Sequence, residues 1–528
     1  MSNHAYESAA ALRPSSNGPI PISTLCERFS LAPASAEDAA ALNDLSILGV
    51  SVDSGDTAAG ELFVGLPGFT VHGARFAAQA VASGAVAVLT DADGAQIVHE
   101  SAPGTPVLVH ADPRAVVGPL SAEVYHHPAR GLVTTAVTGT NGKTTTAYFL
   151  DAILSAHVGG CMVAGTVELR VGERSVESPR TTVEAPVLQR MMALAVEDKV
   201  GAASLEASSH AIVLHRLDGI VVDVAGFTNL QRDHLDFHKT MEGYLEAKAQ
   251  LFTPEHARRG VVCVDDQWGA TLAAEAPIEI DRVRAYPGDT PADWWVSDAA
   301  VSLTDSATTF TLHGPDGEKI EASCPLPGLV NVQNAALALV MAIRAGVPAA
   351  TAATALAGAH NIPGRMQRIS QRDGRRGLCI VDFAHTPEAM ELALKAVRPI
   401  TPGRLIVVFG SDGDRDQGKR PMLGEVCARL ADVLVVTDEN PRSEDPQLIR
   451  NAILEGVRGV RPDLTDVEEI TTWRGDAVRR GVELCGPDDT VIVTGKGHEP
   501  FLEMAGEFIR YNDAPVMAEA VEEKWGRA

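Results

Sequence analysis

A nine-residue stretch rich in glycine and threonine carries the clearest chemistry in this sequence. Residues 138–146 read Thr-Gly-Thr-Asn-Gly-Lys-Thr-Thr-Thr. Gly139 and Gly142 allow the backbone to turn its N–H groups toward an anion. Lys143 can reach the β- and γ-phosphates of a nucleotide, and the Thr144 hydroxyl can ligate Mg²⁺. The stretch therefore predicts a phosphate-binding loop; the alternative is a plain strand-to-helix turn with a surface lysine.

The segments on either side of this loop have the patterns that a phosphate-binding loop needs. Residues 131–137 are rich in β-branched side chains and predict a buried strand. After the loop, apolar residues recur at helical spacing, at Phe149, Leu150, Ile153, Leu154 and Val158. The N-terminus of that helix would add its dipole to the attraction for phosphate, which favours the functional interpretation.

Further polar side chains follow predicted strands of the same region. Residues 202–205 and 221–227 predict strands that alternate with helices, which indicates a mostly parallel sheet. Ligands of such sheets gather at the carboxyl ends of the strands, so Glu206 and His234 are candidate metal ligands. Taken alone, His234 is more often a capping or packing residue. Lys248, within a predicted helix, is more often solvated.

Length and composition bound the class of protein. The 528 residues predict two to four domains. A net charge of −25 without a basic run argues against nucleic acid as a partner. The seven cysteines form no C-x-x-C pair, which argues against zinc and for a reduced, cytoplasmic setting. No apolar run reaches about 18 residues and the N-terminal residues lack the apolar core of a signal peptide, so membrane insertion is not expected.

The chain on either side of the central region predicts two further α/β units. Residues 21–111 predict a small one, preceded by a flexible tail at 1–20 that is rich in Ser, Ala and Pro. Residues 363–528 predict a doubly wound, Rossmann-like sheet with polar loops on one edge, from strand-then-loop patterns at 378–383, 404–409, 433–437 and 490–493. No G-x-G-x-x-G follows these strands, which argues against a dinucleotide site.

Two features lie between the central sheet and the C-terminal unit. Residues 308–321 alternate around Gly-Pro-Asp-Gly and predict a hairpin, which we interpret as a β insertion on the central domain. The segment from 327 to 339 predicts a helix. Asn331 and Asn334 would then be an N-cap and a first-turn residue of that helix.

Several spaced motifs resemble those of the Mur ligase family. The loop Gly-Thr-Asn-Gly-Lys-Thr has Val137 where the general pattern has glycine, and this short form resembles Mur ligases and folylpolyglutamate synthetases. T-T-V-E-A-P, L-E-A-S-S-H, N-L-Q-R-D-H-L-D and Y-x-x-A-K-x-x-L-F follow in the order of the MurE branch. The resemblance implies three α/β domains: a uridine-binding domain at 21–111, a central ATP-binding domain at 112–362 and an amino-acid-binding domain at 363–528.

The reaction implied by this resemblance is an ATP-dependent ligation in peptidoglycan precursor synthesis. ATP would phosphorylate the D-glutamyl carboxylate of UDP-N-acetylmuramoyl-L-alanyl-D-glutamate, because a carboxylate alone is a poor electrophile. The amine of meso-diaminopimelate would then attack the acyl phosphate. Mg²⁺ would neutralise the phosphates. These small molecules would be the partners of a cytoplasmic monomer.

The resemblance also implies roles for individual residues. The catalytic set would be Lys143, Glu206, His234, Lys248 and Asp382. ATP would contact Gly139, Thr140, Asn141, Gly142, Lys143, Thr144, Thr145, Asn331, Asn334, Arg365 and His385. The UDP-muramyl substrate would contact Val52, Ser54, Phe69, Thr70, Val71, Thr181, Thr182, Ser208 and Arg216. Mg²⁺ would be held by Thr144, Glu206, His234 and Lys248, the last as a carbamate that offers two hard oxygens.

Loops of the C-terminal domain would choose the acceptor. Diaminopimelate carries a second carboxylate that lysine lacks, and a planar arginine fork suits it. The implied acceptor residues are Arg415, Glu439, Asn440, Pro441, Arg442, Gly495 and Glu499. Four positions depart from the family pattern: Gly55 in place of arginine, Leu214 in place of glutamine, Gln367 in place of glutamate and Glu439 in place of aspartate. Three alternatives stay open: L-lysine as acceptor, a folylpolyglutamate synthetase, and a nucleotide-binding switch without catalysis.

Overall fold

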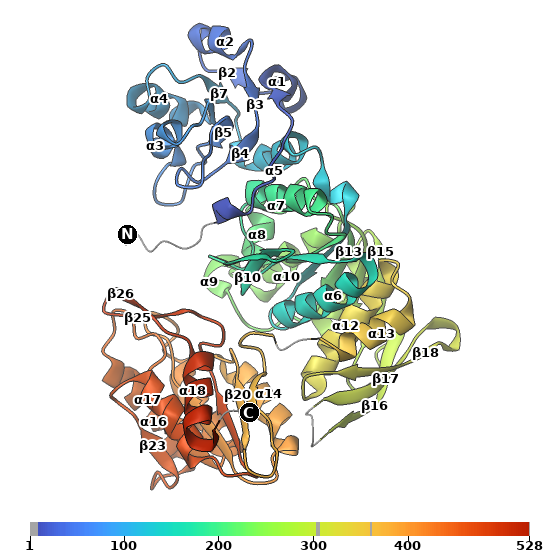
Figure 1. Ribbon diagram of the computed structural model, residues 1–528, viewed down its shortest axis with the longest axis vertical. Helices are drawn as coiled ribbons and strands as arrows, with labels where there is room; N and C mark the ends of the chain where they lie inside the picture. Colours follow the sequence, from blue (N-terminus) through green and yellow to red (C-terminus); the bar gives the residue numbers. More distant parts are fainter. Residues whose placement is uncertain (1–8, 303–306, 360–361, 527–528) are drawn as a thin grey trace. The chain divides into compact units, whose positions relative to one another are not determined.

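The computed structural model describes residues 9–302, 307–359 and 362–526, which fall into two compact units (Figure 1). Unit 1 comprises Met1–Trp295 with Ala336–Ala355, and unit 2 comprises Val296–Ala335 with Leu356–Ala528. The three domain boundaries expected from the sequence remain predictions. Among the described residues, none of the helices combines the length and apolar character needed to cross a bilayer.

The N-terminal part of unit 1 is a small α/β sheet. Its strand order is β2-β7-β6-β5-β4, and β4 to β7 run parallel. The strands are β2 Ala32–Pro33, β4 Gly49–Ser51, β5 Glu61–Val64, β6 Ala87–Thr90 and β7 Val107–Val109, and a separate pair is β1 Ile20–Pro21 with β3 Ser46–Ile47. The helices are α1 Ile22–Phe29, α2 Ala36–Leu42, α3 Ala77–Ala82, α4 Ala92–Ser101 and α5 Pro113–Val124.

The segment before this sheet differs from the flexible tail that its composition predicts. Residues 9–11 form a short 3₁₀ helix, η1, and the Leu12 side chain is 0% exposed within the core of the central sheet. Ser15 and Asn17 make hydrogen bonds to residues far along the chain. The prediction of a tail is therefore wrong for residues 9–18, because one buried leucine and long-range hydrogen bonds hold them.

The central part of unit 1 is a mostly parallel sheet, as the alternation of strands and helices predicts. The order β11-β10-β9-β12-β8-β13-β14-β15-β16 places β8 between β12 and β13. The strands are β8 Val133–Thr138, β9 Cys161–Ala164, β10 Glu168–Val171, β11 Arg174–Glu177, β12 Ala202–Glu206, β13 Val222–Phe227, β14 Ala257–Cys263, β15 Glu279–Arg284 and β16 Trp294–Val301, the last of which begins in unit 1 and ends in unit 2. The predicted strands at 202–205 and 221–227 are confirmed by β12 and β13.

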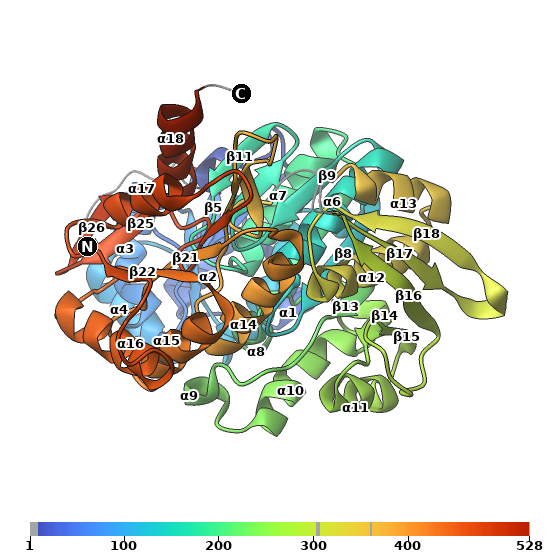
Figure 2. The same ribbon diagram turned by 90° about the horizontal axis from the view of Figure 1, so that it is seen from below.

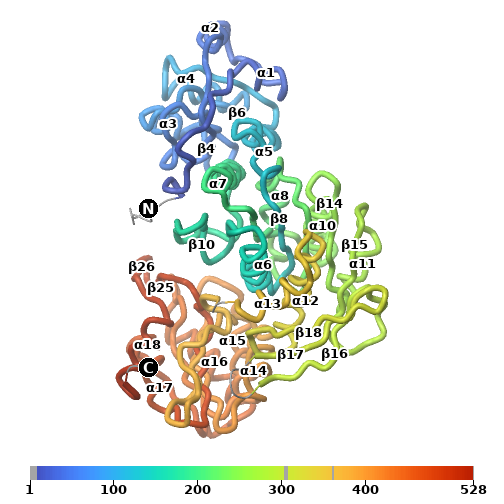
Figure 3. Tube along the Cα trace, turned by 45° about the vertical axis from the view of Figure 1, so that its right-hand side comes forward, coloured from blue at the N-terminus to red at the C-terminus, as the bar shows by residue number. Residues whose placement is uncertain are grey.

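Helices cover both parts of unit 1. They include α6 Lys143–Val158, α7 Ala185–Glu197, α8 Ser209–Val213, α9 Leu235–His238, α10 Met241–Ala249 and α11 Gln267–Glu275. Helix α6 contains the predicted apolar face, of which Phe149, Leu150, Ile153 and Leu154 are buried. Helix α5 of the N-terminal part lies beside α7 of the central part (Figure 3). These two helices join the two sheets within one unit.

Unit 2 contains the predicted hairpin and the predicted C-terminal sheet. The hairpin pairs β17 Thr308–His313 with β18 Lys319–Cys324. Helix α12, Leu329–Arg344, begins two residues before Asn331, so the expectation that Asn331 is an N-cap is wrong. The Asn331 amide instead donates to the Pro327 carbonyl at 2.8 Å within the first turn. Asn334 lies in the second turn, and its buried Oδ1 has no hydrogen-bond partner among the described residues.

The C-terminal sheet has the order β19-β20-β24-β21-β22-β23. Its strands are β19 Gln367–Ser370, β20 Leu378–Val381, β21 Leu405–Phe409, β22 Val433–Val436, β23 Val467–Glu469 and β24 Thr490–Val493. The four strands predicted from the sequence are neighbours and run parallel, so their following loops share one edge, as expected.

Helices lie on both faces of this sheet. Figure 2 shows α17 Arg474–Leu484 and α18 Asp513–Trp525 on one face, and α14 Pro387–Val397, α15 Lys419–Leu430 and α16 Pro446–Val460 on the other. A separate hairpin, β25 Phe501–Met504 with β26 Glu507–Arg510, follows the loop after β24. The remaining described α-helix of the chain is α13 Ala349–Ala357.

Candidate active site

The phosphate loop lies between β8 and α6, in the predicted strand–loop–helix context. Gly139 and Gly142 have φ values of +143° and +90°, which favour glycine. A Cβ atom at position 139 would collide with the Thr228 hydroxyl, so the neighbouring loop also requires glycine there. Helix α6 begins at Lys143, directly after the loop, so the positive end of the helix dipole lies beside the loop and favours an anion there.

The loop after β13 braces the phosphate loop. The Thr140 N–H donates to the Asn229 carbonyl at 2.9 Å, and the Asn141 N–H donates to Asn229 Oδ1 at 3.1 Å. The Thr228 hydroxyl donates to the Asn141 carbonyl at 2.6 Å. The Lys143 ammonium donates to the carbonyls of Gly139 and Thr140, each at 2.9 Å. Two neighbouring strand ends therefore fix the loop's shape.

A cluster of oxygen donors lies at the start of α6. The buried Glu206 carboxylate accepts hydrogen bonds from the Thr144 hydroxyl at 3.0 Å and from the Thr166 hydroxyl at 2.9 Å. The Thr166 N–H donates to the other carboxylate oxygen of Glu206 at 2.8 Å. A carboxylate and a hydroxyl this close beside a phosphate loop are the hard oxygen donors that Mg²⁺ prefers, so Thr144 and Glu206 fit a magnesium site.

The residues predicted to hold the muramyl peptide connect to this cluster. The Thr182 hydroxyl donates to the Glu206 carbonyl at 2.6 Å and accepts the Ser208 N–H at 3.0 Å. Arg216 donates to the Thr182 carbonyl at 3.1 Å and pairs with Glu184 at 3.0 Å. Thr166 reaches Thr181 at 3.2 Å. Hydrogen bonds thus join the phosphate loop to all four predicted substrate residues of the central sheet.

His234 lies in a group of aromatic side chains. It has a φ of +52° and precedes α9. Its ring centre lies 4.8 Å from that of His210 and 6.2 Å from that of Tyr244, both edge-on. Partial burial lowers the pKa of His234, against the opposing effect of Asp233, so its neutral form is favoured. A neutral imidazole is the form that ligates a metal.

Lys248 is buried, contrary to the usual state of a helix lysine. Its side chain is 1% exposed, and its ammonium donates to the Gly139 carbonyl at 2.8 Å and lies 4.4 Å from the centre of the Tyr244 ring. Burial, followed by the charge of Lys143, lowers the pKa of Lys248 well below its usual value. The structure therefore brings the lysine to the phosphate loop and favours the neutral amine.

The predicted uridine contacts occupy two neighbouring loops of the N-terminal sheet. Val52 and Ser54 follow β4, and 69–71 follow β5, which runs parallel beside β4. Ser54 is nearly buried and donates to Gln79 at 3.1 Å. Phe69 is 87% exposed. An exposed aromatic ring on a tight loop offers a surface on which a flat base could stack.

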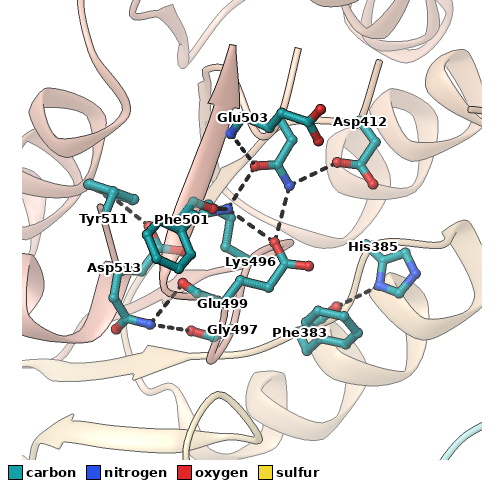
Figure 4. Close-up of polar contacts among 12 residues, drawn as sticks. Phe383, His385, Asp412, Lys496, Gly497, Glu499, Phe501, Glu503, Tyr511 and Asp513 are labelled. Atoms are coloured by element: carbon teal, nitrogen blue, oxygen red, sulfur yellow. Dashed lines mark hydrogen bonds and ion pairs between the residues drawn. The ribbon is translucent and has the colours of Figure 1, made fainter. Parts of the chain in front are cut away.

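In unit 2, the loops after β22 and β24 share a network around one buried lysine (Figure 4). Lys496 is 0% exposed and donates to Asn440 Oδ1 at 2.9 Å, to Glu499 Oε2 at 3.1 Å and to the Phe501 carbonyl at 2.6 Å. The Asn440 amide in turn donates to Glu499 and to Asp412, each at 3.1 Å. The predicted acceptor residues Asn440 and Glu499 are therefore brought together.

Arg442 lies beside this network with two acidic neighbours. Its guanidinium lies 3.5 Å from Asp412 Oδ2 and 3.4 Å from Glu503 Oε2. Its φ is +54°, and Pro441 before it is buried. Arg415, which was predicted for the same pocket, lies exposed in the loop after β21.

Glu439 is buried under the same loop edge. A Cβ atom at position 495 would collide with its carboxyl group, so Gly495, with a φ of +109°, closely approaches it. Burial, followed by the charge of Asp412, raises the pKa of Glu439 to about 8. The glutamate that replaces the family's aspartate therefore packs against the predicted acceptor loop as a largely protonated acid at neutral pH.

The loop after β20 positions the remaining predicted residues of unit 2. The buried Asp382 accepts the N–H groups of Met366 at 2.8 Å and of Ala384 at 2.9 Å, and burial raises its pKa. Arg365 lies 4.4 Å above the Phe383 ring, and that ring lies 4.7 Å from the ring of His385. In this structure Asp382 therefore fixes the loop backbone that carries His385.

Three residues in these networks were missed by sequence reasoning. Thr166 is an isolated threonine between β9 and β10, without a motif to mark it. Asp412 lies in a polar loop with several acidic residues, so nothing singles it out. Lys496 lies between two residues that were predicted, Gly495 and Glu499, and its position in the Gly-Lys-Gly-His-Glu stretch was the available signal.

Comparison with known protein families gives three matches along the chain. The Mur ligase middle domain matches residues 137–342, and the Mur ligase glutamate ligase domain matches residues 364–497. A third match, to the Mur ligase family catalytic domain, covers residues 46–124. The matches include the phosphate loop, the cluster at Glu206 and the loop edge of the C-terminal sheet.

Individual relatives align over nearly their whole length. The UDP-N-acetylmuramoyl-L-alanyl-D-glutamate–2,6-diaminopimelate ligase of Streptomyces coelicolor is 42% identical over 96% of this chain and 97% of its own. The UDP-N-acetylmuramyl-tripeptide synthetase of Leifsonia xyli is 42% identical over 95% of this chain and 96% of its own. A solved structure of a diaminopimelate ligase of the first kind has 31% identity and a TM-score of 0.63, and covers 90% of this chain and 95% of its own.

Proposed function

Because this chain belongs to the Mur ligase family, we propose that it joins meso-diaminopimelate to UDP-N-acetylmuramoyl-L-alanyl-D-glutamate at the expense of ATP. The observation that carries the proposal is the hydrogen-bonded chain from Thr144 through Glu206 to Thr182. It connects a phosphate loop with residues suited to a substrate carboxylate. A ligase that phosphorylates a carboxylate needs these two groups side by side.

The first proposed step forms an acyl phosphate. A D-glutamyl carboxylate oxygen attacks the γ-phosphorus of ATP, and the bond to the β-phosphate oxygen breaks to release ADP. Lys143 and the N–H groups at the start of α6 stabilise the charge on the phosphates. Thr144, Glu206 and His234 would hold Mg²⁺, which supplies further neutralisation when bound. Thr181, Thr182, Ser208 and Arg216 would orient the carboxylate.

The second proposed step forms the amide. The neutral amine of the acceptor attacks the acyl carbon, the bond to the phosphate oxygen breaks, and the amine loses a proton as inorganic phosphate leaves. Asn440, Arg442 and Glu499, with Arg415, Glu439, Pro441 and Gly495, would bind the acceptor. Asn331, Asn334, Arg365, Asp382 and His385 would contact or position the nucleotide.

Lys248 is proposed to act as a carbamate. Its neutral amine would attack CO₂, form an N–C bond and release a proton, which leaves an anion with two oxygens. Its burial, and the cation of Lys143 that lowers its pKa, favour the neutral form that can react. The resulting anion would be stabilised by the same Lys143 charge that disfavours an ammonium.

A second acceptor, L-lysine, is favoured by one observation. The Arg442 guanidinium already has Asp412 and Glu503 within 3.5 Å. The second carboxylate of meso-diaminopimelate would have to compete with these two groups for the Arg442 guanidinium. An acceptor without that carboxylate would leave the pairs unchanged. We place meso-diaminopimelate first because Arg442 is present and because the Streptomyces relative is named for that acceptor.

The ligase proposal is tested by phosphate release from ATP in the presence of Mg²⁺. The expected result is phosphate release that requires both the UDP-muramyl dipeptide and a diamino acid. We expect this activity from the monomeric protein under the reducing, near-neutral conditions of a cytoplasm. Release that needs neither substrate would identify a nucleotide switch. Release driven by a folate and glutamate would identify a folylpolyglutamate synthetase instead.

A further inference from the structure

The segment at residues 9–18 bridges the two sheets of unit 1. Leu12 is buried in the core of the central sheet. Ser15 N–H donates to both carboxylate oxygens of Glu197, at the end of α7, at 3.0 and 2.9 Å. The Asn17 amide donates to the carbonyls of Leu48 at 2.7 Å and Val124 at 3.0 Å, which belong to the N-terminal part. One short segment therefore contacts both parts.

Asp56 is the point at which this segment, the N-terminal part and α7 meet. Arg13 of the segment donates to the Asp56 carbonyl and lies 3.3 Å from Asp56 Oδ1. Arg190 of α7 pairs with Asp56 Oδ2 at 2.9 Å. Arg190 also donates to the carbonyls of Leu12 at 3.2 Å and Ala9 at 2.7 Å. Arg13 further pairs with the buried Glu61 of β5.

The Arg190–Asp56 pair is largely excluded from water. The Arg190 side chain is 1% exposed, and that of Asp56 is 14% exposed. Removing one partner of such a pair leaves a buried charge without compensation, so breaking the contact between the two parts is costly. The pair uses one oxygen of Asp56, and Arg13 uses the other.

Asp56 belongs to the loop that carries the predicted uridine contacts. The loop after β4 contains Val52 and Ser54, and it is closed by hydrogen bonds from Asp56 N–H and the Thr57 hydroxyl to the Asp53 carbonyl, each at 3.0 Å. A shift of Asp56 would therefore move Ser54 with it. A Cβ atom at position 55 would lie 3.3 Å from Asp53 Oδ1, so a side chain there would require a small shift of the Asp53 carboxylate.

Helix α7 links this loop to the other end of the substrate. Thr181 and Thr182, predicted to hold the muramyl peptide, directly precede the helix, whose N-cap is Glu184. Arg190 lies six positions after that N-cap, or about 9 Å along a helix that rises about 1.5 Å per residue. A single rigid element thus carries one substrate subsite at its start and the anchor of the other subsite along its length.

We propose that Arg190, Asp56 and the segment at residues 9–18 are positioning elements that set the spacing between the uridine loop and the muramyl-peptide residues. This inference rests on the proposed function, because it assumes a substrate that spans both subsites. Arg13 fixes the loop from the N-terminal segment, and Arg190 fixes it from α7.

The test is steady-state kinetics of the full chain carrying Asp56→Asn. A loop free to move should raise KM for the UDP-muramyl dipeptide about tenfold or more, while kcat at saturation and KM for ATP stay within about twofold, because the phosphate loop is untouched. Asp293→Asn is the matched control, since it removes an Asp–Arg pair, with Arg282, elsewhere in unit 1. It should leave all three constants unchanged.

A second variant protects the test against a folding defect. Arg13→Gln keeps the buried Arg190–Asp56 pair and should raise the same KM by about threefold or more. An unchanged KM for the UDP-muramyl dipeptide in both folded variants would overturn the inference, as would an equal loss toward all three substrates. Failure of the proposed function is distinguishable, because the wild-type protein would then show no release of phosphate that depends on the UDP-muramyl dipeptide.

Discussion

Two buried lysines, one in each unit, have opposite surroundings. Lys248 in unit 1 is 1% exposed, and its described contacts are a backbone carbonyl and the face of Tyr244. Lys496 in unit 2 is 0% exposed, and its ammonium contacts the Glu499 carboxylate, the Asn440 amide oxygen and the Phe501 carbonyl. Equal burial therefore gives two different environments for the same side chain.

The difference teaches that the consequence of burial for a lysine depends on the partners that surround its ammonium. Burial, followed by the charge of Lys143, lowers the pKa of Lys248 and leaves a nucleophilic amine at the phosphate loop. Lys496 has a carboxylate and two further acceptors arranged around its donors, the arrangement expected of a fixed cation. We infer that Lys248 belongs to the chemistry and that Lys496 orients the acceptor loop.

The largest effect is expected when the Lys143 charge, which lies near Lys248, is removed. Lys143→Ala should lower kcat by about 10²–10³-fold, because one preorganised charge-stabilising donor is lost from the phosphate loop. The measurement is phosphate release at saturating substrates, with circular dichroism to confirm folding. Near-normal turnover in the folded variant would remove Lys143 from the mechanism.

The next effect tests the chemistry of Lys248 directly. Lys248→Ala should lower activity by about 10²-fold, because a charged group beside the nucleotide is lost. Added acetate or bicarbonate should restore part of the activity by supplying oxygen ligands in the vacated space. A free, unmodified lysine in the crystal structure of an active preparation would contradict the carbamate.

A smaller effect is expected at Lys496, and it should differ in kind. Lys496→Met keeps the length of the side chain but loses the hydrogen bonds that orient Asn440 and Glu499. We expect KM for the acceptor to rise about tenfold, with KM for ATP unchanged and no rescue by acetate. Lys496→Arg is the conservative variant and should retain part of the affinity. A fall in kcat with an unchanged acceptor KM would refute the positioning role.

The last prediction concerns the pH dependence of stability at Glu439, not activity. Because burial raises its pKa to about 8, the folded protein binds this proton more tightly than the unfolded chain does. The associated stability is fully present below the unfolded pKa of about 4.5 and is lost as pH rises through about 8. The free energy of unfolding of the Glu439→Gln variant, relative to that of the wild-type protein, should therefore increase with rising pH, by up to about 1.4 kcal/mol per pH unit. Parallel denaturation curves for both proteins from pH 5 to 8.5 would contradict this.

The two regions also differ in how far the sequence predicts them. The phosphate loop and the four polar loops of the C-terminal sheet follow from local patterns, since each is a buried strand followed at once by polar residues. Glu206 and His234 were found because they end or follow such strands. Local patterns therefore predicted which edges of the two sheets carry the candidate sites.

What the sequence does not predict depends on contacts between distant residues. The burial of Lys248 follows from the approach of Gly139, more than a hundred residues earlier in the chain. Lys496 acquires its role from Asn440, on a different strand end. The N-terminal segment has the composition of a tail, yet Arg190 and Glu197 of α7 hold it. Composition reports the average character of a segment and cannot report its tertiary partners.

The measurement that tests the central claim most directly is the ratio of kcat/KM for meso-diaminopimelate and L-lysine, with the UDP-muramyl dipeptide and ATP saturating. A charge-assisted pair with Arg442 is worth about 1.5–3 kcal/mol, or about 10–100-fold. We therefore expect at least about a tenfold preference for meso-diaminopimelate that Arg442→Ala abolishes and Arg442→Lys only partly keeps. Equal or higher efficiency with L-lysine in the wild-type protein would contradict the account.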